Sequence, residues 1–258
     1  MIIFRKKMDL NCDMGESFGN YKMGNDEEIM RYISSANVAC GFHAGDPMVM
    51  AHTVKLAKEN GVAIGAHPGF PDLMGFGRRK MEIAPEEARN YIIYQIGALK
   101  AFVEREGMEL QHVWLHGALS SVAAKNEAIA RAIIEAIKET HPELIFVHRP
   151  GLATYEIAKA LGMKVAISVG VDIEYGPDGM AVLQRKKRYT DPKEAAKKAI
   201  RIAKEGKMTA TTGEDIEMKA HTILVHGDTP NAVEILKEIR EEFEKENIVV
   251  SPLREILE

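Results

Sequence analysis

The segment DPMVMAHTVKLAKENGVAIGAH, residues 46–67, contains one complete structural unit of this chain. Asp46 before Pro47 is typical of a helix start, because the acid accepts free backbone N–H groups and proline fits the first turn. Gly61 is typical of a helix end, since glycine readily adopts the left-handed conformation of a C-cap. The apolar run Val62–His67 lacks polar alternation, as expected of a strand covered on both faces. The segment therefore predicts a helix followed by a buried strand.

The same pattern repeats along the chain. Further apolar runs predict strands at Met8–Met14, Ala36–Phe42, Leu110–His116, Leu144–His148, Val165–Val171 and His221–His226, with room for an eighth strand at Ile248–Pro252. Helical stripes separate these runs, so the sequence predicts a parallel sheet. Seven or eight such units in 258 residues fit an α/β fold, with a single distorted TIM-like (β/α) barrel as one domain over residues 1–258.

The competing fold is a doubly wound open sheet. That fold usually carries a glycine fingerprint after its first strand, and neither G-x-G-x-x-G nor G-x-x-x-x-G-K-[ST] occurs in this sequence. The absence of both motifs favours the barrel. We expect Gly179–Arg185 and Lys207–Lys219 to form additional β structure outside it.

The composition is that of an ordinary globular protein, with 46% hydrophobic and 28% charged residues and a formal net charge of -4. Because 38 acidic residues outnumber 34 basic ones and no basic tract occurs, the sequence argues against a nucleic-acid partner. No apolar run reaches the ~18 residues of a membrane span, and the first residues lack the charge order of a secretory signal. We therefore expect a cytoplasmic protein without a membrane partner.

Histidines and acids collect at the carboxyl ends of the predicted strands. Five of the nine histidines lie there, and acids join them: His43, His67, His116, His148 and His226, with Asp13, Asp46, Asp172 and Asp228. In a barrel these strand ends meet at one rim, which is where such enzymes place their active sites. Burying so many ionisable groups is costly unless they are paired, solvated or metal-bound, so we interpret them as a functional cluster.

Some of these residues have a second interpretation. Asp46 and Asp228 could act only as helix caps. His148 precedes Arg149–Pro150 and is better explained as a loop residue. Arg78 offers a guanidinium to an anionic group, or else it is a solvated loop residue.

Several long motifs occur in order along the chain. They are DLNCDMGE at 9–16, SSANVACGFHAGD at 34–46, VAIGAHP at 62–68, FGR at 76–78, YQIGAL at 94–99, HGAL at 116–119 and HGD at 226–228. Through these motifs the chain resembles, nearly end to end, the LamB/YcsF family, the A component of prokaryotic ATP-dependent 5-oxoprolinase. The resemblance implies a barrel of the glycoside hydrolase/deacetylase type. It also implies a role in opening the lactam ring of 5-oxoproline to glutamate, with partner subunits and consumption of ATP.

The chain departs from the family pattern in two places. The fourth strand usually reads Lys-Pro-His-Gly-Ala-Leu-Tyr-Asn, whereas here Trp114 and Leu115 precede the histidine and Ser120 follows the leucine. The sixth strand usually ends Phe-Ala-Asp-Arg-x-Tyr, whereas Ile173 here takes the place of the arginine. Cationic side chains there would be natural partners of a carboxylate or phosphate, so these departures bear on the substrate and on ATP coupling.

The leading hypothesis is a hydrolase that opens a cyclic amide, which must activate water and stabilise an oxyanion. The expected catalytic residues are Asp13, His43, His67 and His116. The expected substrate-binding residues are Glu16, Asp46, Arg78, Asp172 and Asp228, with Arg78 holding a substrate carboxylate. No phosphate-cradling loop is visible, so ATP is expected to be handled by a partner chain or at a non-standard site.

Two other hypotheses remain open. The first is a metal-dependent deacetylase or amidohydrolase without ATP, because Asp13, His67 and His116 lie on three strand ends and form a plausible divalent-metal set. The second is a non-catalytic relative that binds a small molecule, which the altered fourth and sixth strands suggest.

Overall fold

Strand β1 (Lys7–Met14) lies in the middle of the sheet in the computed structural model, which describes residues 6–182 and 187–257. Seven of its eight residues are buried. It pairs in parallel with β2 (Ser35–Ala39) on one side and β10 (Thr222–Val225) on the other. The full strand order is β6-β5-β4-β3-β2-β1-β10-β7, with β3 (Ala63–His67), β4 (Leu110–Val113) and β5 (Ile145–Val147) following one another. The predicted parallel sheet is thereby confirmed.

The two edges of the sheet are connected through a single residue between β6 and β7. Strands β6 (Val165–Ala166) and β7 (Ser168–Gly170) are separated only by Ile167, yet β6 pairs with β5 whereas β7 pairs with β10. The Ile167 N–H donates to Nδ1 of His221 at 2.9 Å, and its carbonyl accepts from the His221 N–H at 2.8 Å. The predicted strand Val165–Val171 is therefore two short segments that bridge the sheet edges and form a nearly closed barrel.

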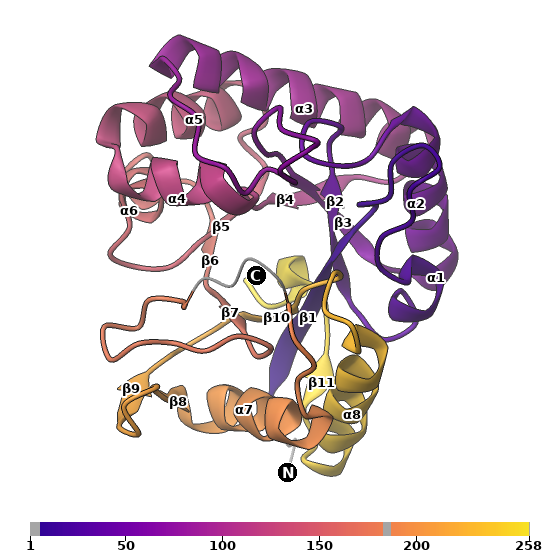
Figure 1. The fold of residues 1–258 in the computed structure, drawn as a ribbon, viewed down its shortest axis with the longest axis vertical. Helices are drawn as coiled ribbons and strands as arrows, with labels where there is room; N and C mark the ends of the chain where they lie inside the picture. The colour runs from indigo at the N-terminus through magenta and orange to yellow at the C-terminus, as the bar shows by residue number, and fades with distance from the viewer. Residues whose placement is uncertain (1–5, 183–186, 258) are drawn as a thin grey trace.

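Helices surround the barrel (Figure 1). They are α1 (Asp26–Ile29), α2 (Pro47–Asn60), α3 (Pro85–Arg105), α4 (Gly117–Lys125), α5 (Glu127–Thr140), α6 (Ala153–Ala160), α7 (Pro192–Glu205) and α8 (Ala232–Lys245). Asp46 caps α2 as predicted, since its side chain accepts from the N–H groups of Met48 and Val49, and Gly61 ends the helix at φ 67°. None of the described helices is long and apolar enough to cross a membrane.

The remaining β structure lies outside the barrel path. The eighth strand that the sequence leaves room for is β11 (Val249–Val250), which pairs only with the start of β1. Strands β8 (Lys207–Thr209) and β9 (Asp215–Glu217) form the antiparallel hairpin expected within Lys207–Lys219. Of the excursion predicted at Gly179–Arg185, a bridge between Tyr175 and Ala181 is present, and residues 183–185 lie outside the described residues.

The C-terminal segment lies inside the ring of strands (Figure 1). Leu253, which begins the 3₁₀ helix η1 (Leu253–Glu255), packs against Ile145, Val147 and Ala166 in a cluster separate from the main core. The Arg254 N–H donates to the Gln111 side chain at 3.1 Å. Trp114 packs against the same cluster, so the one tryptophan of the chain helps to fill this part of the barrel.

Asp9 is a fully buried acid in β1. Its Oδ1 accepts from the hydroxyls of Ser34 at 2.7 Å and Ser35 at 2.6 Å, while Oδ2 has no partner among the described residues. Burial raises the pKa of Asp9 from its ordinary 3.8 to about 6, although these hydroxyl groups lower it in part. The folded chain therefore retains this proton to a higher pH than the unfolded chain.

We predict a pH-dependent cost from Asp9. Because its folded pKa is raised, the free energy of unfolding should fall by up to about 3 kcal/mol as the pH rises from about 4 to about 6, and stay level above. Asp9→Asn cannot ionise, so its stability relative to the wild type should increase across that window. Urea denaturation at several pH values measures this difference, and parallel pH profiles of the two proteins would contradict it.

Candidate active site

The carboxyl ends of β1 to β4 bring one acid and three histidines into contact. Glu16 follows β1, His43 follows β2, His67 ends β3 and His116 caps α4 after β4. One ligand atom from each of these four side chains lies within 4.8 Å of all the others, and all four residues are buried. The structure thus brings together three predicted catalytic residues and Glu16.

His67 and His116 face each other with their unprotonated nitrogens. Nδ1 of His67 lies 2.7 Å from the Trp114 carbonyl, and Nε2 of His116 lies 2.8 Å from the Phe76 carbonyl. Since a carbonyl can only accept, each of those nitrogens carries a proton, and the other nitrogen of each neutral ring is a lone-pair acceptor. These two acceptors, His67 Nε2 and His116 Nδ1, are 3.0 Å apart. Such a contact requires a proton or a cation between them.

Asp13 and Glu16 flank this pair of nitrogens. Asp13 Oδ1 lies 3.6 Å from His67 Nε2, and Glu16 Oε1 lies 3.8 Å from His116 Nδ1. Glu16 Oε1 also lies 3.2 Å from Nε2 of His43, whose ring stacks on His116 at 3.6 Å between centroids. The metal set predicted from sequence was Asp13, His67 and His116; the set whose ligand atoms lie within 4.8 Å of one another shares the two histidines and contains Glu16 and His43.

The two acids have opposite pKa shifts. Burial raises the pKa of Glu16 well above its usual range, and the nearby Asp13 and Asp228 raise it further. Burial acts in the same direction on Asp13, but His67, His226 and the Asn37 amide outweigh it and hold the pKa of Asp13 below its usual value. Environments that push two acids apart in this way are typical of an acid and base pair.

The histidines of the cluster bind a proton less readily than a free histidine, because burial lowers the pKa of each of them. Burial lowers the pKa of His116 to about 3, and the neighbouring His67 contributes. Burial holds the pKa of His43 well below its usual range, and the electrostatic effects of His116 and His67 act in the same direction. Nδ1 of His43 has no hydrogen-bond partner among the described residues, so the cluster contains a buried polar atom that is free for a ligand.

Asn37 and His112, which the sequence analysis did not single out, hold Asp13 in place. The Asn37 amide donates to Asp13 Oδ1 at 2.9 Å, and Nε2 of His112 lies 2.7 Å from Oδ1 of Asn37. Gly65 makes room for this arrangement, because a Cβ on it would lie 2.1 Å from Nε2 of His112. Both polar side chains lie inside strands whose sequences look apolar. The sequence alone does not indicate that these side chains point toward the barrel axis, so it could not identify them.

A second predicted group forms around Asp172. Its carboxylate lies 2.9 Å from Nδ1 of His226 and accepts from the Thr229 hydroxyl at 2.6 Å. Lys187 Nζ approaches the same carboxylate to 3.8 Å. Burial opposes ionisation, but His226 and then Lys187 outweigh it, so the pKa of Asp172 lies well below its usual range. Lys187 is a cation of the rim that the sequence analysis missed.

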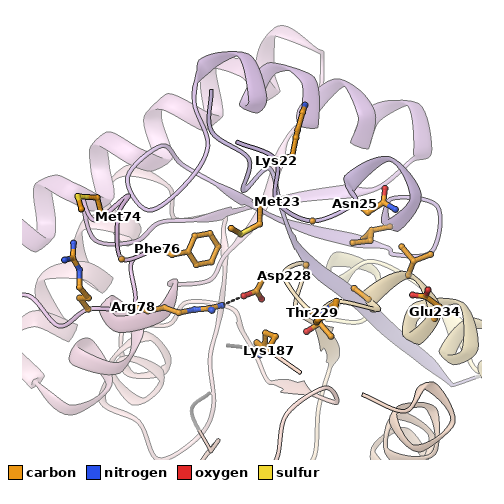
Figure 2. Close-up of a pocket in the computed structure, with 18 of the residues that line it drawn as sticks. Lys22, Met23, Asn25, Met74, Phe76, Arg78, Lys187, Asp228, Thr229 and Glu234 are labelled. Carbon is orange, nitrogen blue, oxygen red and sulfur yellow. Dashed lines mark hydrogen bonds and ion pairs between the residues drawn. The ribbon is translucent and has the colours of Figure 1, made fainter. Parts of the chain in front are cut away.

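A cavity of about 1280 Å³ opens beside the cluster. Its lining includes Lys22, Met23, Phe76, Arg78, Lys187 and Asp228 (Figure 2). Nη2 of Arg78 donates to Asp228 at 2.7 Å. The Phe76 ring lies 5.3 Å from the His116 ring and 5.6 Å from the His43 ring, so it stands between the cavity and the buried histidines.

Two predicted residues lie apart from the cluster. The Asp46 carboxylate accepts a hydrogen bond from a third backbone N–H, that of Gly19, at 2.7 Å. Both of its oxygens therefore bind backbone groups near the start of α2. The His148 ring lies 3.0 Å from the Ser120 hydroxyl and 2.8 Å from the Thr154 hydroxyl, in keeping with the structural interpretation.

Comparison with known proteins agrees with this geometry. The sequence model of the LamB/YcsF family matches residues 8–258. The chain belongs to the LamB/YcsF family. The A subunit of 5-oxoprolinase from Thermococcus onnurineus is 55% identical over 253 residues, which are 97% of this chain and 99% of that protein. The crystal structure of a lactam utilization protein from Thermus thermophilus superposes with a TM-score of 0.90 at 44% identity, covering 95% of this chain and 99% of that one.

A more distant likeness concerns the fold alone. A structure described as T48 deacetylase with substrate superposes with a TM-score of 0.51 at 14% identity, covering 98% of this chain and 90% of that one. The barrel of this LamB/YcsF protein therefore shares its fold with that structure, in agreement with the expected barrel.

Three of the positions at which this chain departs from the family pattern hold apolar residues that pack inside the fold. Leu115 is buried, and Trp114 packs against the Leu253 cluster. Ile173 packs against the main core, and a Cβ on Gly170 would lie 3.2 Å from it. The sequence offers Arg78, Arg185 and Arg188 on neighbouring loops as replacements for the missing cations. Of these, Arg78 lines the cavity and Arg185 lies outside the described residues.

Proposed function

We propose that this chain is the A component of a 5-oxoprolinase, which opens the lactam ring of 5-oxoproline to give glutamate. Residues 1–258 would be one catalytic domain, located in the cytoplasm as the sequence predicts. Similarity over nearly the full length to proteins named as the A subunit of 5-oxoprolinase supports the reaction. The observation that carries the chemistry is the placement of Asp13 and Glu16 at 3.6 Å and 3.8 Å from the facing nitrogens of His67 and His116, in environments that shift the two pKa values in opposite directions.

Opening the ring needs two proton movements. Water adds to the carbonyl carbon and loses a proton, and the C–N bond breaks as the nitrogen gains one. Asp13 is ionised and suits the role of base, which is worth ~10²–10⁴-fold in rate. The pKa of Glu16 lies well above its usual range, so this carboxyl suits donation to the oxyanion or to the departing nitrogen. His43, His67 and His116 would orient these groups and relay protons.

Cations of the cavity would bind the substrate carboxylate. Arg78 is the proposed partner, because its guanidinium lines the cavity and lies beside Phe76. Asp172 and Asp228 would hold Lys187 and Arg78 in place for this purpose. A substrate role for Asp46 stays a prediction.

ATP would be used through partner subunits. Phosphorylation of the amide oxygen, with release of ADP, would make the ring carbon much easier to attack. Addition of water and cleavage of the C–N bond would then leave an acyl phosphate, and a second water would release phosphate and glutamate. The relatives are named as one lettered subunit of an enzyme, which supports the existence of further subunits.

A divalent metal is a second candidate that one observation favours. The facing lone pairs of His67 and His116, with Glu16 and His43 beside them, form a donor set that suits a cation such as zinc. Bound there, a metal would polarise the substrate carbonyl. Elemental analysis of protein purified without chelator tests this, and stoichiometric metal that is lost in His116→Ala would favour the metal-dependent amidohydrolase alternative.

The proposed function is tested by a turnover assay. The chain is mixed with 5-oxoproline and ATP, with and without the partner subunits encoded beside it, and glutamate and phosphate are followed together. Glutamate formation only in the complete mixture supports the proposal. Ligand binding without turnover in any mixture would favour the non-catalytic alternative instead.

We predict that the isolated chain hydrolyses little or no ATP. The sequence contains no G-x-x-x-x-G-K-[ST] loop, so it lacks the usual cradle for a triphosphate. Phosphate release from ATP by the pure chain, with and without 5-oxoproline, measures this. Robust hydrolysis by the chain alone would contradict the assignment of ATP to partner subunits.

We also predict weak binding of 5-oxoproline to the isolated chain. Loss of two cations removes charge-assisted hydrogen bonds worth about 1.5–3 kcal/mol each, which corresponds to roughly 10²–10⁴-fold in affinity. Trp114→Lys with Ile173→Arg should tighten binding in calorimetric titrations, provided that the variant unfolds near the wild-type temperature. Tight binding by the wild type would show that these positions do not set the affinity.

A further inference from the structure

Large apolar side chains are exposed at one end of the barrel. Of the ten large hydrophobic residues that are exposed in the described part of the chain, nine lie on the loops or helix starts that follow the carboxyl ends of strands; the tenth, Tyr94, lies within α3. The described residues at the opposite end expose none. Because monomeric proteins seldom expose contiguous apolar surface, this one-sided distribution indicates an interaction surface.

Six of these residues form what we call the mouth patch. They are Phe18, Tyr21, Met23, Met48, Leu73 and Met74, from the β1–α1 loop, the start of α2 and the β3–α3 loop. Tyr21, Met48 and Met74 are 80%, 79% and 94% exposed. Methionine and aromatic residues are enriched at protein interfaces, where they adapt to a partner surface.

The patch is tied together and borders the cavity. The Gly19 N–H donates to Asp46 at 2.7 Å, which fixes the β1–α1 loop to the start of α2. Met23 and Met74 line the same cavity from different loops (Figure 2). A partner that covers the mouth patch would therefore also cover the opening to the site.

Charge defines the partner more closely. Residues 17–25 and 73–80, which carry five of the six mouth-patch residues, contain four cations and no acid. Arg78 is paired with Asp228 and Arg79 with Asp72, so Lys22 and Lys80 carry the remaining positive charge. The Lys22 and Lys80 side chains form no ion pair within the described residues. A complementary surface is apolar at its centre and acidic at its edge.

The cavity itself needs a cover. At about 1280 Å³ it exceeds the ~300–1,000 Å³ of typical small-molecule pockets, and a small lactam would leave much of it to water. Hydrolysis of an activated amide benefits from a closed site that excludes bulk solvent. The chain does not supply such a cover from its described residues.

We infer that the mouth patch is the docking surface for another subunit of the enzyme, which presents an apolar segment fringed by acidic groups and closes the cavity over the substrate. The inference rests on the proposed function in its choice of partner.

The test measures association rather than turnover. Met74→Glu and Tyr21→Glu place a charge in the patch, and Lys164→Glu, an exposed change at the start of β6 on the opposite end, is the matched control. Each purified chain is titrated against the purified partner subunits encoded beside it. We expect both patch variants to bind at least about tenfold more weakly, whereas the control binds as the wild type. All three should unfold at the wild-type temperature, because the side chains are exposed.

A charge reversal tests whether the partner surface is acidic at its edge. Lys22→Glu with Lys80→Glu should weaken association and reduce its dependence on salt, since two attractive contacts at the edge are lost. Patch variants that bind like the wild type would overturn the inference. So would a wild-type chain that dimerises through the patch, seen as a dimer that Met74→Glu converts to a monomer without loss of partner affinity. Association that follows these expectations without any glutamate formation would contradict the proposed function and leave the docking surface standing.

Discussion

Asp13→Asn should lower turnover of the complete enzyme by ~10²–10⁴-fold and leave the stability of the chain nearly unchanged. The amide cannot take a proton from water, so the base is lost. The fold tolerates the change because the oxygen of the new amide can still accept the hydrogen bond that Asn37 gives to Asp13 Oδ1 at 2.9 Å. Glutamate release at saturating substrate and the urea midpoint of the isolated chain measure the two effects.

Asp191→Asn is the matched control for this change. Asp191 caps α7, where it accepts from the N–H groups of Lys193 and Glu194, and asparagine caps helices about as well. The control should therefore retain both activity and stability. An Asp13→Asn chain that unfolds much more easily, yet turns over normally in its folded fraction, would show that Asp13 is structural.

His67→Ala should likewise abolish turnover with little loss of stability. Without His67, no proton or cation has to be held between two buried nitrogens 3.0 Å apart, and this gain offsets part of the cost of the cavity. His148→Ala is the comparison, because His148 is also a buried histidine after a strand. Among the described residues, its ring lies at hydrogen-bond distance from the Ser120 and Thr154 hydroxyls alone. It should lose stability and keep activity.

The residues at the rim could be predicted because all strands of a parallel barrel end at the same rim. A residue that directly follows a strand in the sequence therefore lies at that rim. His43, His67 and His116 lie at the ends of three different strands, so we expect them to lie close together from the topology alone. The ends of the strands themselves were less certain. The predicted run Ala36–Phe42 stops at Ala39, because Gly41 turns the chain at φ 91°.

The supporting groups could not be predicted for a different reason. Asn37 and His112 lie inside strands, where a polar residue in an apolar run gives no indication of the side to which it points. Lys187 belongs to the long segment between β7 and α7, which has no periodicity that would place it beside Asp172. Such contacts depend on closure of the barrel, which brings together residues that are distant in sequence.

Gly65→Ala should strongly destabilise the chain. Gly65 has an ordinary strand conformation, so the cost is steric: the new methyl group would lie 2.1 Å from Nε2 of the fully buried His112. The ring must move, and its contact with Asn37 at 2.7 Å is then lost. Overpacking and a broken buried hydrogen bond together suggest a loss of about 3 kcal/mol or more.

Turnover should fall in the folded fraction of Gly65→Ala as well, because Asn37 would no longer hold Asp13 in a single orientation. Gly97→Ala is the matched control, since no atom lies within 4 Å of a Cβ at that position in α3, and alanine there should stabilise the helix by up to about 1 kcal/mol. Denaturation with urea compares the two variants, and a wild-type midpoint for Gly65→Ala would contradict the expected clash.

A second substitution separates the steric effect from the positioning effect. His112→Ala removes the ring that Gly65 accommodates, so Gly65→Ala should cost much less in that background, with a coupling energy of about 1–3 kcal/mol. Activity should not recover in the double variant, because Asn37 still lacks the partner that orients its amide toward Asp13. Recovery of both stability and turnover would mean that His112 only fills space. Recovery of stability alone would mean that the hydrogen-bonded line from His112 through Asn37 to Asp13 is part of how this barrel prepares its base.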